Sequence, residues 1–222
     1  MDPLTILLQQ MKGSDGGYVS LDIEQQQQIW RIAELLISLE LFDRQGGVEQ
    51  LEAVEIARGQ PVIAYILATR LTEPDVALRG RIARLMDDML CQGNSQVQAT
   101  LRYQLGQMRT QQVIALLQVV IADPTLQHPA SRLLKECSFA GTHLAEIMLD
   151  RDVPVSLRKL AVQYIGQIGF LDAMPALERA MNRLISRAPN QRVLPGMPAD
   201  ILDEELGLLP LVKEAITELK AP

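Results

Sequence analysis

The chain has 222 residues and a formal net charge of −6 at pH 7, and 48% of its residues are apolar but only 4% aromatic. The negative charge disfavours general affinity for nucleic acids or anionic membranes. With so few aromatic residues, aliphatic side chains must build the core, which favours helices packed on helices over β-sheet. The length allows one large domain, two small domains or a single elongated one.

The cysteines and the N-terminal segment predict the cellular compartment of the protein. Cys91 and Cys137 are far apart and form no C-x-x-C motif, so we expect two buried thiols in a reducing environment. The start, MDPLTILLQQMKG, lacks a basic region before its short apolar run, and no apolar run approaches the ~20 residues of a membrane span. We therefore expect a cytoplasmic protein.

Residues 1–47 are predicted to form an N-terminal helical cap. Within it, residues 21–42 have the periodicity of one long helix. Its apolar residues recur at spacings of three and four: Ile29, Ile32, Leu36 and Leu39. Gly46-Gly47 is predicted to end this segment.

Residues 48–187 alternate helical runs of about a dozen residues with short breaks. The predicted helices cover 48–57, 61–71, 75–91, 95–107, 111–122, 129–137, 141–149, 155–168 and 172–187. The breaks carry ordinary helix signals, such as the capping-box pattern of Thr72-Glu73-Pro74-Asp75. No window alternates apolar and polar residues over a strand's length, so we predict no sheet.

A repeat of about 30 residues runs through this region. LGQMRTQQVIALLQ (105–118) aligns with IGQIGFLDAMPALE (165–178), and Cys137 takes the glycine position in a copy between them. A second match aligns Leu78-Arg79 with Leu157-Arg158, each followed by an apolar helix face. Units of this length, each a helix pair, imply a solenoid in which neighbours bury one another's faces. Arg79 and Arg158 are predicted to bridge adjacent repeats through Asp or Glu.

Residues 155–177 (VSLRKLAVQYIGQIGFLDAMPAL) resemble a HEAT-like repeat of the short bacterial kind, which also occurs in phycobilisome lyases. The residues that carry the resemblance are Val155, Arg158, Ala161, Gly166, Gly169, Asp172, Ala173, Pro175 and Leu177. It is recognisable at 97–122, faint at 75–90 and 129–149, and absent from 1–56 and 188–222. The resemblance implies a right-handed α-solenoid that serves as a protein-binding scaffold.

The predicted fold is therefore all-α: an α-solenoid of HEAT-like antiparallel helix pairs over 48–187 with helical caps at both ends. A Pro-rich loop is predicted at 188–199, because three prolines and Gly196 exclude a helix across most of 187–200. Residues 200–222 follow as an acidic C-terminal helical cap that protects the last apolar face.

Gly166-Gln167-Ile168-Gly169 has two interpretations. A phosphate-binding turn needs outward backbone N–H groups, usually after a strand and at a helix N-terminus. Here a helix precedes the turn and no Lys-Ser/Thr follows it. We therefore favour a structural role, in which Gly166 lets two helices approach closely and Gly169 ends the first of them with a positive φ.

Other candidates for chemistry have ordinary explanations. His143-x-x-Glu146 places two ligand types on one helix face, but a catalytic metal usually needs three, and His128 is the only other histidine. Neither cysteine lies beside a histidine in sequence, and no G-x-S-x-G motif occurs. The acids at 203–205 are interpreted as a helix start. We predict no catalytic residues, no metal and no cofactor.

A basic region at 151–192 is the candidate binding site. It carries seven basic and three acidic residues, whereas the segments before and after it are neutral and acidic. Its arginines at 179, 183 and 187 form a stripe along one helix face, opposite a predicted core face of Leu177, Met181, Leu184 and Ile185. The simplest explanation is a solvated face, and the alternative is an anionic ligand surface. The candidate partner-binding residues are Arg151, Lys159, Arg179, Arg183, Arg187 and Arg192.

We expect a non-enzymatic protein-binding scaffold or adaptor of the HEAT-repeat type, whose partner is another protein with an acidic segment. Two alternatives stay open. One is an accessory protein or lyase of the phycobilisome-lyase type, which a co-purifying tetrapyrrole would support. The other is a nucleic-acid-binding HEAT-like protein that uses the basic stripe, which binding with a steep salt dependence would support.

Overall fold

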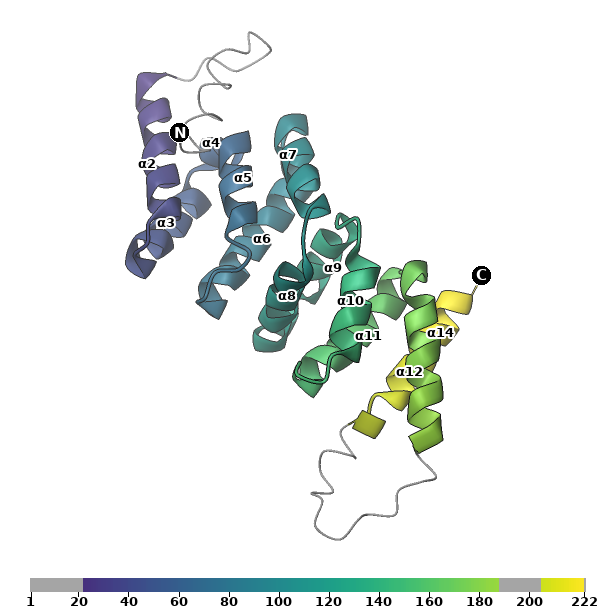
Figure 1. Cartoon of the computed structure of the whole chain (residues 1–222). Coiled ribbons are helices and arrows are strands. Elements are labelled where there is room, and N and C mark those ends of the chain that lie inside the picture. Colours follow the sequence, from purple (N-terminus) through teal and green to yellow (C-terminus); the bar gives the residue numbers. More distant parts are fainter. Residues whose placement is uncertain (1–21, 188–204, 222) are drawn as a thin grey trace. The chain divides into compact units, whose positions relative to one another are not determined.

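A computed structural model of the chain describes residues 22–187 and 205–221 (Figure 1). Apart from turns and two short 3-10 helices, these residues form α-helices, and they contain no strand. The prediction of an all-α protein is thereby confirmed. The chain divides into two compact units, Met1–Gln104 and Leu105–Pro222, which are described one at a time below.

The first unit is built from consecutive helices that pack on their neighbours. They are α2 (Ile23–Ile37), α3 (Leu41–Ala53), α4 (Glu55–Arg58), α5 (Pro61–Thr69), α6 (Val76–Gln92) and α7 (Ser95–Gly106), whose end lies in the second unit. Helix α2 contacts α3, α4 and α5, while α6 contacts α3 and α5. Asp22 and Asp75 cap α2 and α6 by accepting a backbone N–H with the side chain. The predicted capping box at 72–75 is wrong in its register, because Asp75 is the N-cap residue itself and not the third residue of the helix.

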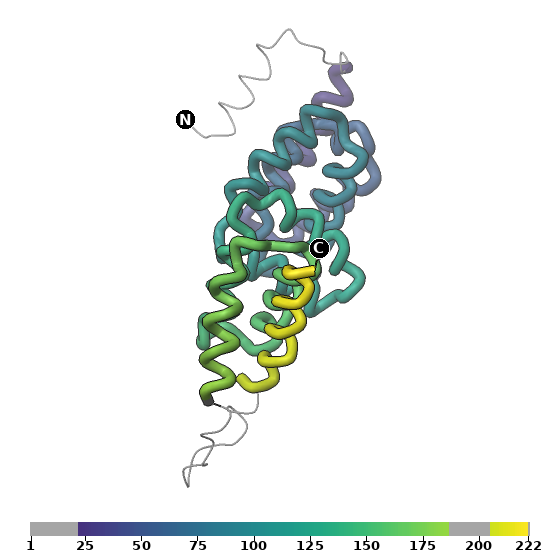
Figure 2. Tube along the Cα trace, turned by 90° about the vertical axis from the view of Figure 1, so that its right-hand side faces the viewer, coloured from purple at the N-terminus to yellow at the C-terminus, as the bar shows by residue number. Residues whose placement is uncertain are grey.

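The second unit contains two layers of helices. Its elements are α8 (Thr110–Ala122), η1 (Pro124–Leu126), α9 (Gln127–Lys135), α10 (Ala140–Leu149), α11 (Val155–Ile168), η2 (Leu171–Ala173), α12 (Met174–Arg187) and α14 (Leu209–Lys220). Helices α8, α10 and α12 contact one another in succession, and so do α9, α11 and α14. Figure 2 shows α14 running beside α12 at the end of this unit.

The predicted helix over 21–42 is wrong in one respect, because the chain breaks at 38–40 into α2 and α3. Arg44 stabilises this break, since its Nη1 donates to the freed carbonyl oxygens of Ser38 (3.1 Å) and Leu39 (2.6 Å). Gly46-Gly47 lies inside α3, so the prediction that it ends a helical segment is wrong. A Cβ on Gly47 would lie 3.0 Å from Leu35 Cβ, so this glycine lets α3 pack closely on α2.

Aliphatic side chains form the core of both units, as the composition predicts. The two aligned faces are buried throughout: Leu78, Ile82, Leu85 and Met86 on α6, and Leu157, Ala161, Tyr164 and Ile165 on α11. Cys137 is buried and Cys91 is exposed, so the prediction of two buried thiols is wrong for Cys91. Cys91 lies on the last turn of α6, outside that helix's buried face.

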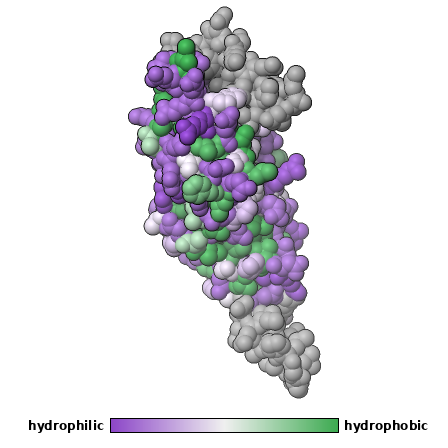
Figure 3. All heavy atoms as spheres, turned by 90° about the vertical axis from the view of Figure 1, so that its left-hand side faces the viewer, coloured by the Kyte–Doolittle hydropathy of each residue, from purple (hydrophilic) through white to green (hydrophobic). Residues whose placement is uncertain are grey.

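The first unit also exposes apolar residues around the α2–α3 turn, where Leu39 is 93% and Phe42 84% exposed. Leu39 was predicted on the apolar face of a helix, and the break at 38–40 places it outside. Figure 3, viewed from the side of α2 and α3, shows apolar residues interrupting a largely hydrophilic surface. No helix in the described part of the chain is both long and apolar enough to cross a bilayer.

Candidate functional site

The basic region predicted as a binding site is distributed over several elements of the second unit. Arg179 is exposed and Arg183 partly buried, one turn apart on α12, and Arg187 is the last residue of that helix. Lys159 is partly buried on α11, and Arg151 lies exposed in the turn before α11. Arg192 lies outside the described residues. Arg179 and Arg183 thus lie one turn apart on α12, as their spacing predicts, and the side chain of Arg187 lies outside the described part of the chain.

The opposite face of α12 is the core face, with one correction. Leu177 and Leu184 are 0% and 2% exposed, and Met181 is partly buried. Ile185 is 45% exposed and does not belong to the core. It follows Leu184 and lies about 100° around the helix from it, at the edge of the buried face that is farther from Arg183.

Two residues of the basic region share one carboxylate. Glu205, just before α14, lies 3.3 Å from Arg151 Nε and 3.7 Å from Arg158 Nη1, measured at its Oε1. Arg158 is 2% exposed and also donates from Nε to the Met148 carbonyl oxygen at 2.9 Å. The acidic C-terminal segment thus neutralises part of the basic region within the same chain. Its other predicted acids, Asp203 and Glu204, lie outside the described residues.

The G-x-x-G turn has the two structural roles predicted for it. Gly169 follows α11 with φ +91°, the single positive φ among the described residues, and its N–H reaches back to Ile165 and Gly166 carbonyls. Gly166 faces α14, because a Cβ there would lie 2.9 Å from Ala215 Cα. The helix that approaches Gly166 is the C-terminal one, which the sequence did not indicate.

Arg79, the counterpart of Arg158, belongs to a buried cluster in the first unit. Its Nε donates to the Glu73 carbonyl oxygen at 2.7 Å, and burial lowers the pKa of its guanidinium. Arg79 therefore binds a backbone carbonyl in the α5–α6 connection, whereas Arg158 binds one near the end of α10. Arg158 pairs with the acid Glu205, whereas the predicted bridge from Arg79 to an acid stays a prediction.

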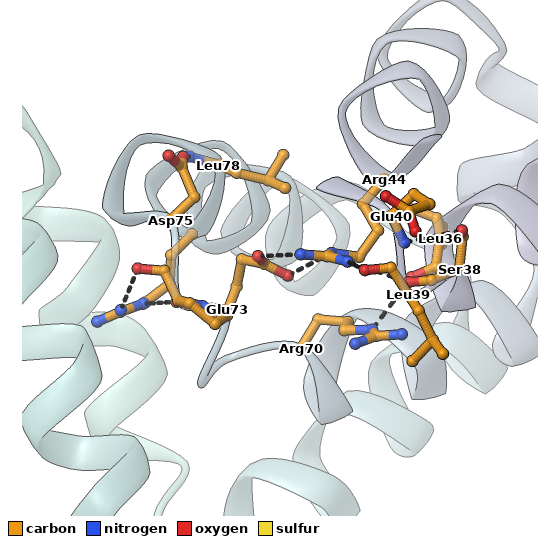
Figure 4. Close-up of polar contacts among 11 residues, drawn as sticks. Leu36, Ser38, Leu39, Glu40, Arg44, Arg70, Glu73, Asp75 and Leu78 are labelled. Carbon is orange, nitrogen blue, oxygen red and sulfur yellow. Dashed lines mark hydrogen bonds and ion pairs between the residues drawn. The ribbon is translucent and has the colours of Figure 1, made fainter. Parts of the chain in front are cut away.

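Glu73 stands at the centre of this cluster and its side chain is fully buried. Its two carboxylate oxygens accept from Arg44 Nε at 2.8 Å and from Arg44 Nη2 at 2.7 Å, a bidentate pair. That hydrogen bond and charge raise the pKa of Arg44 despite its burial. Nearby, Arg70 Nε donates to the Leu36 carbonyl oxygen at 3.1 Å. The cluster ties α2, α3 and the α5–α6 connection together (Figure 4).

His143 and Glu146 are engaged with α8 and the turn before it. His143 Nε2 lies 3.1 Å from the Met108 carbonyl oxygen and Nδ1 lies 2.9 Å from Thr110 Oγ1. Thr110 Oγ1 in turn donates to Glu146 at 2.8 Å. Because both ring nitrogens face protein groups, this histidine joins two helix pairs. The described residues contain no cluster of three or more His, Cys, Asp or Glu side chains suited to a metal ion.

Cys137 lies in the same junction, and its Sγ faces the Met108 carbonyl oxygen at 3.9 Å. Burial raises the pKa of its thiol, which disfavours the nucleophilic thiolate. This is the packing role predicted from its place in the repeat. Neither this junction nor the arginine cluster brings together a nucleophile, a base and an oxyanion donor.

No family model, curated protein or solved structure matches this chain. The functional interpretation therefore rests on the residues themselves. Sequence reasoning identified the basic stripe but missed Glu205 as its internal partner and Arg44–Glu73 as a buried ion pair. The pairs are separated by long stretches of chain, and no local motif marks either of them. The one usable signal was the charge asymmetry between 151–192 and 193–222.

Proposed function

We propose that the helix pairs stack as a HEAT-like solenoid and that the protein is a non-enzymatic scaffold or adaptor. In this proposal the arginine-bearing face of α12 takes an acidic segment of another protein. The observation that carries it is the amphipathic division of α12. Leu177, Ala180 and Leu184 are buried, while Arg179 is exposed on a helix at the end of the repeats.

The spacing of tertiary contacts supports the repeat architecture. Several side-chain bonds between helix pairs join residues 29 to 42 positions apart, as a repeat of about 30 residues requires. Examples are Arg44–Glu73, Arg81–Glu52, Thr110–His143, Thr142–Asp172 and Lys220–Glu178. These bonds are what contacts between neighbouring helix pairs within a unit would produce, and they support the proposed stacking. Stacks of this kind expose extended surfaces that proteins use for binding.

The charge of α12 supports the proposed partner chemistry. Guanidinium groups bind carboxylates with paired N–H donors, so an acidic peptide segment matches arginines spaced one turn apart. A nucleic-acid backbone is disfavoured because the whole chain carries a net charge of −6.

The test is charge reversal on α12 in the full chain: Arg179→Glu, Arg183→Glu and Arg187→Glu together. We expect affinity purification with mass spectrometry from the native organism to show at least a tenfold loss of partner recovery. The reason is that reversed charges repel an acidic segment. A control with Lys135→Glu and Lys213→Glu changes exposed charges on α9 and α14 and should keep recovery. Circular dichroism must show unchanged helicity, and undiminished recovery with the triple variant would rule out this surface.

A further inference from the structure

The start of α3 and the turn before it expose large apolar side chains. Among the described residues ten large apolar side chains are exposed, and five of these lie within residues 23–42. Leu39 and Phe42 are almost fully exposed, and Leu41 between them is exposed as well. These three residues are here called the 39–42 surface. Scattered exposed apolar residues are normal, whereas adjacent ones rimmed by polar groups mark interaction sites.

Polar side chains around the 39–42 surface hold its backbone in place. Ser38 Oγ donates to Asp43 Oδ2 at 2.8 Å and accepts the Glu40 N–H at 3.1 Å. Arg44, which belongs to the buried cluster, binds the Ser38 and Leu39 carbonyl oxygens. In Figure 4 the Leu39 carbonyl oxygen is directed at Arg44, and the Leu39 side chain extends away from it. The exposed side chains are therefore presented by an ordered turn, which lowers the entropic cost of binding a partner.

The charge around the 39–42 surface is negative. Residues 22–53 carry seven acids and two arginines, a net charge of −5. One of these arginines, Arg44, is largely buried against Glu73, whereas the acids Glu34 and Glu40 are exposed. A matching partner therefore combines apolar groups with cations beside them. Nucleic acids, anionic membranes and the same surface of a second copy are disfavoured, because each brings further negative charge.

We propose that the 39–42 surface docks a basic amphipathic helix of a partner protein. The apolar face of that helix covers Leu39, Leu41 and Phe42, and its lysine or arginine side chains pair with Glu40 and the other exposed acids of α2 and α3. A helix is the expected shape, because helices cover the inner faces of α2 and α3 as well. This goes beyond the proposed function, in which α12 of the second unit takes a segment of the opposite charge.

The experiment measures the binding of a fluorescent amphipathic peptide to the full chain by anisotropy. The peptide contains alanine, leucine and lysine, with the leucines along one helix face and the lysines beside them. We expect Leu39→Ser/Phe42→Ser to lower its affinity by roughly tenfold or more, because the variant removes the apolar contact and keeps every acid. Circular dichroism should show unchanged helicity, since both side chains are exposed.

Two controls separate this surface from non-specific binding. Phe139→Ser/Leu171→Ser removes two apolar side chains of the second unit that are 63% and 65% exposed, and it should leave the affinity unchanged. A peptide with glutamates in place of the lysines should bind roughly tenfold more weakly, because the acids around the surface repel it. Equal affinities of the two serine variants, or of the two peptides, would overturn the proposal. So would the absence of binding to the parent chain at millimolar peptide.

Other occupants of the 39–42 surface give distinct results. Self-association of the parent chain in sedimentation, lost in Leu39→Ser/Phe42→Ser, would assign the surface to a second copy and overturn the proposal. Peptide affinity that rises in the full chain with Leu7→Ser/Leu8→Ser would assign it to the N-terminal segment and also overturn the proposal. The triple charge reversal on α12 should keep peptide binding, so this proposal and the proposed function can each fail without the other.

Discussion

Glu73 and Arg44 show what a buried ion pair does in this protein. The carboxylate has no exposure and binds two guanidinium nitrogens of Arg44, whose third nitrogen holds the carbonyls at the α2–α3 break. Removing both charges from water is unfavourable, and the bidentate geometry together with the carbonyl bonds compensates for it. The pair therefore contributes little net stability. Its main role is to fix the residue at which α2 ends.

Glu73→Gln should lower the free energy of unfolding by about 3 kcal/mol, because it leaves the Arg44 charge buried without its counterion. Urea unfolding followed by circular dichroism measures this change. The matched control is Glu52→Gln, which removes a carboxylate that pairs with Arg81 at 2.8 Å but is 43% exposed. Exposed pairs contribute at most about 1 kcal/mol. Similar losses for the two variants would contradict the distinct role of Glu73.

At the scale of elements, the contact between α11 and α14 depends on the absence of a side chain. Gly166 lies inside α11, where glycine is unfavourable by itself. The close approach of Ala215 explains its presence. Gly46 in α3 offers the contrast, since a Cβ there meets nothing within 4 Å. The two glycines have similar helical surroundings and differ in what packs against them.

Gly166→Ala should destabilise the chain by roughly 1–2 kcal/mol, because a Cβ 2.9 Å from the Ala215 backbone forces α14 outward. Gly46→Ala should instead stabilise by about 0.5–1 kcal/mol, since alanine favours a helix and finds open space. Urea midpoints of both variants measure the difference. Stabilisation by Gly166→Ala would contradict the close packing of the two helices.

At the scale of the whole molecule, charge and burial together determine the response to pH. The net charge is −6 at pH 7 and becomes more negative at alkaline pH, so general repulsion grows as pH rises. Tyr164 adds a specific contribution. Its hydroxyl donates to the Gln127 carbonyl oxygen at 3.1 Å, and burial raises its pKa to about 12. The folded chain thus holds this proton more tightly than the unfolded chain does.

The contribution of Tyr164 is fully present below the ordinary tyrosine pKa of about 10 and is lost as pH rises toward 12. We expect unfolding free energy to fall over this range by about 2–3 kcal/mol more in the parent than in Tyr164→Phe. The Tyr164→Phe variant keeps the general charge repulsion and loses only the contribution of the tyrosine hydroxyl. Its missing hydrogen bond lowers stability by about 1 kcal/mol at neutral pH, so the slopes are compared. The same pH dependence of the unfolding free energy in both proteins, measured by urea unfolding, would contradict this link between Tyr164 ionisation and stability.

Much of the fold was predictable because helix signals are local. The apolar spacing of α6, α8 and α11 and the glycine after Ile168 determine helices within a residue or two of those observed. The prediction was wrong at 38–40, where helical periodicity continues through the break. The chain departs from that pattern because Arg44 binds the freed carbonyls, and Arg44 is itself oriented by Glu73.

The candidate site was likewise predictable only in part. The amino-acid sequence by itself determined the helices, the small-residue turns, the buried faces and the arginine stripe, since each depends on spacings of a few residues. Only the tertiary structure decided that α14 packs on Gly166 and that Glu205 meets Arg151 and Arg158. These partners are distant in sequence, and their contact depends on how whole helices stack. Periodicity shows which face of a helix is buried, but not which helix buries it.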